Sequence, residues 1–570
     1  MAERTGSATS GVEVEWQFDA IDLRPVERWL AAVTGALPGT SNGSGATVSV
    51  SAKPIKRLVD TYVDTEDWRV GRSGYVLRVR RAGAQGEVTL KDTAGATAGL
   101  RRRLEITEPL PPDGIDSLGA EGPVGRRIRS LAGTRSLRPV LEVRTTRRPY
   151  ELQVGEETVA EVALDETAIS AGDGQRPTRL RRVEVEVDAR WVHALTPLVE
   201  HLRGSCGLQP ATLSKFEAGL MAAGLEVPGP PDLGPTQSPS SPSVGDVAFV
   251  VLRRNLAAMT AHEPGTRLGE DPEELHDMRV AARRMRAALS LFKDMLPVRA
   301  QHFRDELGWL GRMLGAVRDL DVQLERIDEW AKELSQEDKG ALDELAGLLG
   351  RERDVARSQL LACLESIRYE RLVSGFSAML RQGPSRRSAA ARAPALAVVP
   401  DLVESRHRST SKAAKRAQRS GAPDDFHRLR INCKRLRYAL EFVAEIYDGQ
   451  TSKMVRSVVR IQDSLGLMQD ARVAATRLHE LATAETSDLS PTTVFVMGGV
   501  AERHRHEADR VRHRVPADLA ELKGPRWQRL KVLMERKRLE LGALYGWPLQ
   551  PRPPRPVDND PAHEDVVPSP

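Results

Sequence analysis

The chain is poor in aromatic residues and cysteine. Only 4% of its 570 residues are aromatic, which disfavours rows of stacking rings such as those that bind single-stranded nucleic acid. Its three cysteines, Cys206, Cys363 and Cys433, form no CxxC pair. This spacing argues against a disulfide framework or a structural zinc site and fits a reducing compartment.

Long hydrophobic runs are also missing. The longest candidate, Val247 to Leu252, ends at Arg253 and Arg254, far short of the roughly 18 apolar residues that a membrane-spanning helix needs. The first residues, MAERTGSATSG, contain no apolar core of the signal-peptide type. We therefore expect a cytoplasmic protein with no membrane partner.

Three common catalytic motifs do not occur. The sequence contains no GxxxxGK[ST] loop, no HExxH and no GxSxG. Nucleotide-switch, zinc-protease and serine-hydrolase functions therefore lack support.

The positive charge is unevenly distributed. The net charge is +5, but the first 225 residues hold about 30 basic and about 30 acidic side chains. The whole excess therefore lies downstream, which predicts a polyanionic partner for the second part of the chain.

Composition divides the chain into several parts, as its length also suggests. Segments from Glu226 to Asp246 and from Trp547 onward are too rich in proline for helix or strand, and a Pro- and Ala-rich interruption covers Arg381 to Pro400. We predict a first domain at 1–225, a linker at 226–246, a helical domain at 247–545 with halves at about 247–380 and 401–545, and a disordered tail at 546–570.

The first domain is predicted to be a β-sheet, because seven segments alternate with period two. They are VEVEWQF, YVLRVRR, EVTLK, RRRLEIT, VLEVRTTRRPYEL, TVAEVALDETAIS and RRVEVEVD. One face is apolar and the other is charged, as in Glu184 and Glu186. The charged face is either a solvated outer surface or the lining of a closed barrel that binds a metal-bound polyphosphate.

The helical domain contains an internal repeat. HDMRVAARRMRAALSLF begins at His276 and HRLRINCKRLRYALEFV begins at His427, while LGAVRDLDV at Leu314 is echoed by LGLMQDARV at Leu465. Both pairs are 151 residues apart, which indicates a duplicated helical unit.

Each repeat carries a basic stripe. At 100° per residue, His276, Arg279, Arg283 and Arg286 fall within about 80° of one another. In the second repeat the same places are taken by His427, Arg430, Lys434 and Arg437, and the basic residues Arg284 and Arg435 lie on the flank of each stripe. Either the stripes are solvated faces, or they line a shared groove for a repeating anion, which arginine forks bind bidentately.

Two families match these motifs. HxxRxxxRRxR, its echo HxxRxxxKRxRYAL and LGxxRDxD resemble the CHAD domain (conserved histidine α-helical domain). The ordered pieces VEVEWQF, TYVDT, LRVRR, TLK, RLE, VALD, VEVEV and LSKFEAGL resemble the CYTH superfamily of triphosphate tunnel metalloenzymes. A CYTH domain followed by a CHAD domain is itself a recurring architecture.

The resemblance implies a fold and a function. It implies an antiparallel eight-stranded β-barrel tunnel, followed by an all-α domain of two similar bundles. It also implies that the protein binds inorganic polyphosphate, at polyphosphate granules, and a triphosphate-containing small molecule, which the tunnel hydrolyses with Mg²⁺ or Mn²⁺. The implied metal ligands are Glu13, Glu15, Glu184 and Glu186, and the implied phosphate ligands of the tunnel are Arg78, Arg80, Lys91, Arg103 and Lys215. The implied polyphosphate ligands are His276, Arg279, Arg283, Arg284, Arg286, His427, Arg430, Lys434, Arg435 and Arg437.

One departure leaves the activity open. Where the family signature ExExK has lysine, this chain has Gln17, which offers phosphate a neutral hydrogen bond in place of a positive charge. The alternative is therefore a non-catalytic polyphosphate-binding scaffold with a degenerate CYTH domain. A nucleic-acid-binding protein is the third hypothesis, but it would need base readout or aromatic platforms that the sequence does not show.

Overall fold

A computed structural model divides the chain into two compact units, residues 1–231 and 232–570. It describes residues 8–33, 35–36, 47–82, 85–93, 95, 97–115, 118, 122–170, 177–333, 336–447, 449–483 and 489–545. The predicted disordered tail, residues 546–570, lies outside these ranges. Among the described residues, no helix is long and apolar enough to cross a membrane.

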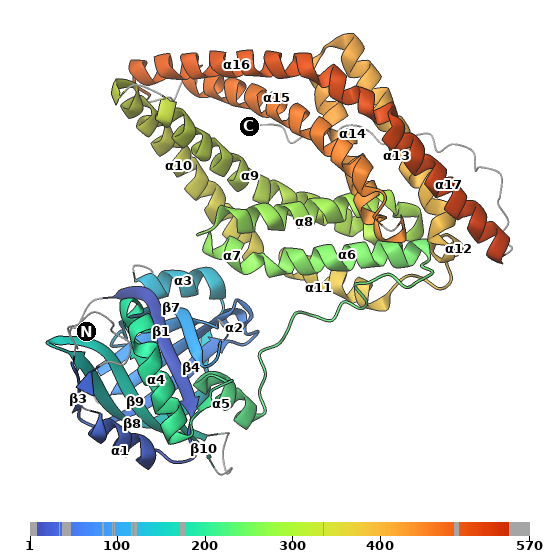
Figure 1. The fold of residues 1–570 in the computed structure, drawn as a ribbon. Helices are drawn as coiled ribbons and strands as arrows, with labels where there is room; N and C mark the ends of the chain where they lie inside the picture. The colour runs from blue at the N-terminus through green and yellow to red at the C-terminus, as the bar shows by residue number, and fades with distance from the viewer. Residues whose placement is uncertain are drawn as a thin grey trace. The chain divides into compact units, whose positions relative to one another are not determined.

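The first unit is an antiparallel sheet that closes on itself (Figure 1). Its strands are β1 (Thr9–Asp19), β2 (Gly35–Ala36), β3 (Thr47–Ala52), β4 (Lys56–Thr65), β5 (Tyr75–Ala82), β6 (Gln85–Asp92), β7 (Leu100–Pro109), β8 (Leu137–Val154), β9 (Glu157–Ser170), β10 (Thr178–Val187) and β11 (Gln209–Pro210). The ring runs β8–β4–β5–β6–β7–β1–β10–β9 and closes because β9 pairs with β8. The predicted eight-stranded barrel is confirmed.

Helices cover the outside of this barrel. They are α1 (Arg24–Ala32), α2 (Arg69–Arg72), α3 (Pro123–Ala132) and α4 (Val192–Cys206), which follows the short 3-10 turn η2 (Ala189–Trp191). A further helix, α5 (Lys215–Ala223), packs Phe216 and Leu220 against the inward-facing Leu141, Val143 and Ile169. Val183 and Val185 of β10 pack in one apolar core with Leu195 of α4. Glu184 lies between these two valines and therefore points to the opposite side, the barrel interior. The interpretation of the charged face as a solvated outer surface is wrong.

The second unit is helical. Its helices are α6 (Val244–Ala261), α7 (Glu263–Leu268), α8 (Pro272–Leu291), α9 (Ala300–Glu333), α10 (Gln336–Glu365), α11 (Ile367–Gln382), α12 (Ala389–Arg392), α13 (Ala395–Ser420), α14 (Pro423–Phe442), α15 (Ser452–Thr483), α16 (Pro491–Ala520) and α17 (Pro525–Tyr545), with 3-10 turns η3 (Lys293–Met295), η4 (Glu445–Tyr447) and η5 (Glu521–Lys523). α6 and α13 begin 151 residues apart, and so do α8 and α14. The predicted repeat of two helical halves is confirmed.

The predicted bounds of the linker and of the interruption between the halves differ slightly from the observed ends of the helices. α6 begins at Val244, three residues before the predicted start of the helical domain, because Ser243 and Asp246 form a capping box. α13 begins at Ala395 and contains Pro400, so the interruption between the halves is shorter than its composition suggests.

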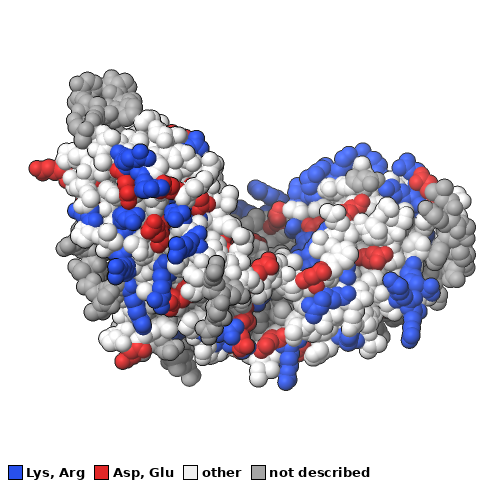
Figure 2. Space-filling view, turned by 90° about the horizontal axis from the view of Figure 1, so that it is seen from below, with Lys and Arg blue, Asp and Glu red and all other residues white. Residues whose placement is uncertain are grey.

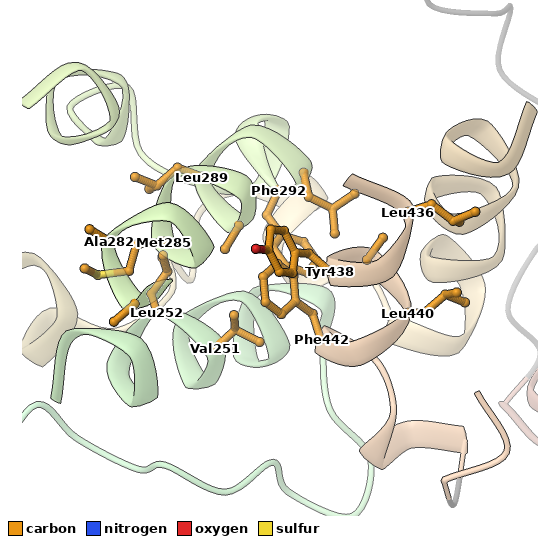
Figure 3. Close-up of a cluster of buried hydrophobic side chains, with 14 of the residues drawn as sticks. Val251, Leu252, Ala282, Met285, Leu289, Phe292, Leu436, Tyr438, Leu440 and Phe442 are labelled. Atoms are coloured by element: carbon orange, nitrogen blue, oxygen red, sulfur yellow. The ribbon is translucent and has the colours of Figure 1, made fainter. Parts of the chain in front are cut away.

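The two halves share one hydrophobic core. Tyr438 and Phe442 of α14 point toward α8, where Phe292 lies beside them (Figure 3). Leu436 and Leu440 point to the other side of α14, into the second half (Figure 3). α14 therefore uses one face to join the halves and another to pack its own bundle.

Candidate functional sites in the barrel and the helical unit

The first group of charges in the barrel joins strands β1, β6 and β7. Lys91 donates to both carboxylate oxygens of Glu13 at 2.9 Å and lies 3.0 Å from Glu105. Arg103 pairs with the buried Glu15. Because only β7 separates β6 from β1 in the ring, the Lys91–Glu13 contact passes over the inner face of β7.

A second group lies on the next three strands of the ring, β10, β9 and β8. Arg147 of β8 makes two hydrogen bonds to Asp165 of β9, at 2.9 and 2.8 Å, and also contacts Glu184 of β10. The Ser214 capping box starts α5 and makes Lys215 its first residue. Lys215 contacts Asp165 and lies 2.9 Å from Glu184. Burial alone would raise the pKa of Glu184, but Lys215 and Arg147 hold it well below its usual range.

A third group lies on β4 and β5. Arg80 donates two hydrogen bonds to the buried Asp60, at 2.7 and 2.9 Å. Against the effect of burial, this fork lowers the pKa of Asp60 to about 2. Arg78 donates to Thr89 at 3.2 Å and lies 3.7 Å from Glu87. Its charge is less directly paired than that of Arg80, and it is better placed for an anion in the barrel.

Gln17 is buried among these charges. Its amide nitrogen donates to Glu15 at 2.8 Å, while its oxygen Oε1 is buried without a hydrogen-bond partner. On the neighbouring strand it lies opposite Glu184. An amide therefore takes the place between two carboxylates that a lysine would hold as an ion pair.

Two other carboxylates are crowded by negative charge. Burial, together with Glu13 and Glu105, raises the pKa of Glu186 to about 7. Burial, which Lys91 offsets only in part, together with Glu15 raises the pKa of Glu13 to about 7. Carboxylates held near other carboxylates suit a divalent cation. In the described residues, no three His, Cys, Asp or Glu side chains are grouped closely enough to hold a metal by themselves.

The structure thus brings all nine predicted tunnel residues into one barrel, although Glu13, Glu15 and Glu184 of the predicted metal ligands are held in ion pairs. Arg147 was not among the residues predicted for the tunnel. Its pairing with Asp165 follows from the register of β8 on β9, which periodicity does not reveal.

The helical unit holds a cluster of cations where α8 meets α14. We call Arg279, Arg283, Arg430 and Lys434 the groove cations. Burial, together with Arg430, Arg283 and Arg279, lowers the pKa of Lys434 to about 7. Arg283 also donates to the hydroxyl of Tyr438 at 2.8 Å. The predicted meeting of the two basic stripes is therefore observed for these residues.

Two aspartates support the groove cations in the same way in each half. Asp319 of α9 lies 3.8 Å from Arg279, and Asp470 of α15 lies 3.8 Å from Arg430. Burial, partly offset by Arg279, and the charge of Asp470 raise the pKa of Asp319, so the two aspartates are near each other. Asp319 and Asp470, which are 151 residues apart, are therefore equivalent partners of the repeat arginines.

The two motif histidines flank the groove cations and are less basic than usual. Burial and Arg318 lower the pKa of His276, and burial and Arg430 lower the pKa of His427. Arg318 is mostly buried and lies 3.2 Å from Glu273. It was not among the predicted site residues, although it stands in the quoted segment LGAVRDLDV.

The remaining basic residues of the stripes lie in different surroundings. Arg284 pairs with Glu441 and lies over the rings of Tyr438 and Phe442, at 5.4 and 5.5 Å from the ring centres. Arg437 also pairs with Glu441, at 2.6 Å. Arg286 lies against Gly308 of α9, and Arg435 is half-buried. The structure therefore gives Arg284 a packing role at the junction of the halves.

The histidine-rich run on α16 has both buried and exposed members. His504 is buried, and its ring meets the edge of Trp330 at 5.0 Å. His506 and His513 are exposed. His504 is buried because α9, α10, α15 and α16 form a small apolar core of their own.

Comparisons with known families agree with the division of the chain into a barrel unit and a helical unit. A model of the CYTH domain matches residues 38–218, and a model of the CHAD domain matches residues 250–479. No curated protein is significantly similar to the chain.

Several solved structures resemble one unit each. The CHAD domain from the plant Ricinus communis is 28% identical and covers 50% of this chain and 95% of its own, with a TM-score of 0.42. PptA from Streptomyces chartreusis is 19% identical and covers 48% of this chain and 99% of its own, with a TM-score of 0.40. A putative adenylyl cyclase from Hippeastrum, described as having a dominant triphosphatase activity, is 15% identical and covers 38% of this chain and 98% of its own, with a TM-score of 0.27.

Proposed function

Since this chain belongs to the proteins in which a CYTH domain precedes a CHAD domain, we propose that it binds condensed phosphates in both units. The helical unit holds inorganic polyphosphate along the groove cations. The barrel binds a triphosphate, or the end of a chain, together with a divalent cation. Binding of long chains would place the protein at cytoplasmic polyphosphate granules, which co-sedimentation with purified granules can test.

The proposal is carried by one observation, the clustering of the groove cations. Like charges repel, and here the repulsion and burial are strong enough to bring the pKa of Lys434 to about 7. Two aspartates at 3.8 Å offset this charge only in part. On the face shown in Figure 2, Lys and Arg are interspersed with Asp and Glu, so single basic side chains mark no site. A cluster built from both halves does.

The chemistry of the groove suits a repeating phosphate. Arginine forks match phosphate oxygens bidentately, and an anion among these cations would relieve their repulsion. Binding of this kind releases counterions, so the affinity should fall steeply with salt. No metal is needed, because the groove already carries the opposite charge.

The barrel needs a cation to bind the same kind of ligand. Its basic residues are paired with carboxylates, which repel phosphate. Mg²⁺ is commonly held by one or two carboxylates together with substrate phosphates, so Glu13 and Glu186 fit as its protein ligands, although the described residues hold no group of three. Bound Mg²⁺ or Mn²⁺ would neutralise phosphate oxygens and polarise the phosphoryl group. Arg78, Lys91, Arg103, Arg147 and Lys215 would orient the phosphates and stabilise charge in the transition state.

Hydrolysis of the bound triphosphate is the first candidate activity of the barrel. The second is a receptor without turnover, and Gln17 favours it, because a neutral amide replaces a positive charge between Glu15 and Glu184. Release of orthophosphate from tripolyphosphate, ATP and thiamine triphosphate, with Mg²⁺ or Mn²⁺, distinguishes the two. Metal-dependent binding without release would identify the receptor.

The polyphosphate site is tested on the full chain in EDTA, so that metal-dependent binding in the barrel does not contribute. Arg283→Ala combined with Lys434→Ala should weaken long-chain polyphosphate binding by at least about 100-fold, since two charge-assisted contacts of about 1.5–3 kcal/mol each are lost. The matched control is Lys412→Ala with Lys415→Ala, which removes two exposed charges of α13. Equal losses in both variants, or tighter binding of double-stranded DNA of similar charge, would reject the proposal.

A further inference from the structure

A cavity of about 320 Å³ lies between the start of α15 and one face of α17. Five of its lining side chains are cationic, and none is acidic. They are Lys453, Arg526, Arg529, Arg536 and Lys537, and the remaining lining residues are Gln450, Leu530 and Leu533. The residues from α17 recur every three or four positions, so they form a single face of that helix. None of the groove cations lines this cavity.

Only part of this positive charge is compensated. Arg526 lies 2.7 Å from Glu521, and Arg536 lies 3.6 Å from Glu540. Lys537 donates to the carbonyl of Ile446 at 3.3 Å. Lys453 and Arg529 have no ion pair with any residue that the structure describes, and both are exposed. The cavity therefore presents uncompensated positive charge to solvent.

In the first half of the repeat, α11 takes the place of α17 but carries different side chains there. Tyr369, Leu372 and Phe376 of α11 are buried with the same spacing as Trp527, Leu530 and Met534 of α17. Arg368 corresponds to Arg526, but it makes two hydrogen bonds to Glu306, at 2.6 and 3.0 Å.

At the position equivalent to Glu306, the second half has Ser457 on α15. In addition, Phe303 stacks on Phe376 in the first half at 4.9 Å, and Met454 stands at its equivalent position. The second half thus has a serine and a methionine where the first half has a carboxylate and a ring, and Glu521 pairs with Arg526 instead.

From this cavity and its charge we propose that α15 and α17 form a second anion site, which takes a small oligophosphate. Several phosphate groups are required to engage cations distributed over about three turns of α17, or roughly 16 Å along its axis. Leu530 and Leu533 offer an apolar floor for an organic group. The ligand is therefore either a free inorganic oligophosphate or one attached to an organic group such as a nucleoside.

The site is tested in the full chain in EDTA, on a background in which Arg283→Ala and Lys434→Ala weaken the groove. Isothermal titration with tripolyphosphate should then show one remaining site per chain. Adding Lys453→Ala and Arg529→Ala should weaken that site about 10- to 100-fold. Both residues are exposed, so the helical content should stay unchanged by circular dichroism. Titration with ATP distinguishes a free inorganic oligophosphate from one attached to an organic group. If ATP binds more tightly than tripolyphosphate does, its organic group contacts the apolar floor.

The matched control is Lys531→Ala, which removes one charge from another face of α17, where Lys531 lies 3.0 Å from Glu404. It should leave the affinity unchanged. The proposal is overturned if no binding remains on the weakened-groove background, if the remaining binding does not respond to Lys453→Ala with Arg529→Ala, or if Lys531→Ala lowers it equally. If instead the groove cations do not bind polyphosphate, the Arg283→Ala and Lys434→Ala background variant would bind long-chain polyphosphate as tightly as the wild type does.

Discussion

The barrel and the groove both gather cations, but they balance them in opposite ways. In the barrel, Arg147 and Lys215 lie against Asp165 and Glu184, so the interior is a network of ion pairs. In the groove, four cations share two aspartates at 3.8 Å. A charged cluster can therefore be stable in two ways, by internal pairing or by partial exposure to solvent.

This difference determines what each site requires of a ligand. A phosphate that enters the barrel has to compete with carboxylates that already hold the cations. A divalent cation bound to those carboxylates would reduce this competition. A phosphate that reaches the groove meets cations that the two aspartates neutralise only in part. The barrel should thus be stable and selective without ligand, whereas the groove should be the more sensitive to salt.

The largest expected effect is the loss of barrel stability when one cation of the network is removed. Arg147→Ala would leave Asp165, which is 0% exposed, with Lys215 as its remaining cation. Breaking a buried ion pair costs about 3–5 kcal/mol, measured as the free energy of unfolding in denaturant. Arg144→Ala on the same strand is the control, since its exposed pair with Glu142 should contribute about 0–1 kcal/mol. Similar costs for both would contradict the paired network.

The next effect concerns turnover in the barrel. Gln17→Lys would restore a positive charge between Glu15 and Glu184. A charge of this kind can stabilise a developing anion by about 2–4 kcal/mol, or about 30- to 1000-fold in rate. The measurement is orthophosphate release from tripolyphosphate with Mg²⁺ or Mn²⁺, compared with wild type from pH 6 to 10. A wild type that already turns over rapidly, with no gain from lysine, would show that Gln17 does not limit the chemistry.

A smaller effect is the pH dependence of the groove. The pKa of Lys434 is lowered to about 7 in the free protein, and a bound phosphate chain would raise it, so binding takes up a proton. Affinity should therefore be highest below pH 7 and fall about 10-fold between pH 6 and 8. Lys434→Arg, which stays charged, should flatten this dependence. An unchanged pH profile in that variant would show that Lys434 is not the titrating group.

The smallest effect on binding is expected for Arg284. Its charge is paired with Glu441 and its guanidinium lies over Tyr438 and Phe442. Arg284→Ala should change polyphosphate affinity less than about threefold, but it should lower the free energy of unfolding by about 1–2 kcal/mol through lost packing and cation–π contact. Titration and denaturation of the same preparation give both values. A binding loss as large as that of Arg283→Ala would place Arg284 in the groove after all.

Much of the fold could be predicted because it depends on periodicity. Alternation located the strands, and the 151-residue offset located the paired helices. Periodicity also divides each helix into faces, which is why Arg279 and Arg283 were found. It assigned Arg284 to the flank of its stripe, but it did not show that Glu441 and two aromatic rings from the other half would hold it.

The missed features depend on contacts between distant segments. Arg147 was not recognised because strand register decides that it meets Asp165. Tyr438 belongs to the buried part of its own helix, yet its hydroxyl accepts a hydrogen bond from Arg283 of the other half. His504 is buried by a small core whose members are spread over four helices, so its neighbours in the sequence do not reveal its environment.

The meeting of equivalent residues in the groove has a consequence for the direction of a bound polymer. Arg279 and Arg430 are equivalent and close to each other, and so are Asp319 and Asp470. Such a site is approximately twofold symmetric, so a chain running through it in one sense meets nearly the same contacts as one running in reverse. Linear polyphosphate has identical ends and no polarity, whereas DNA and RNA strands differ from end to end. A symmetric groove therefore suits a ligand that can be captured in either orientation and can shift by one phosphate without losing its fit.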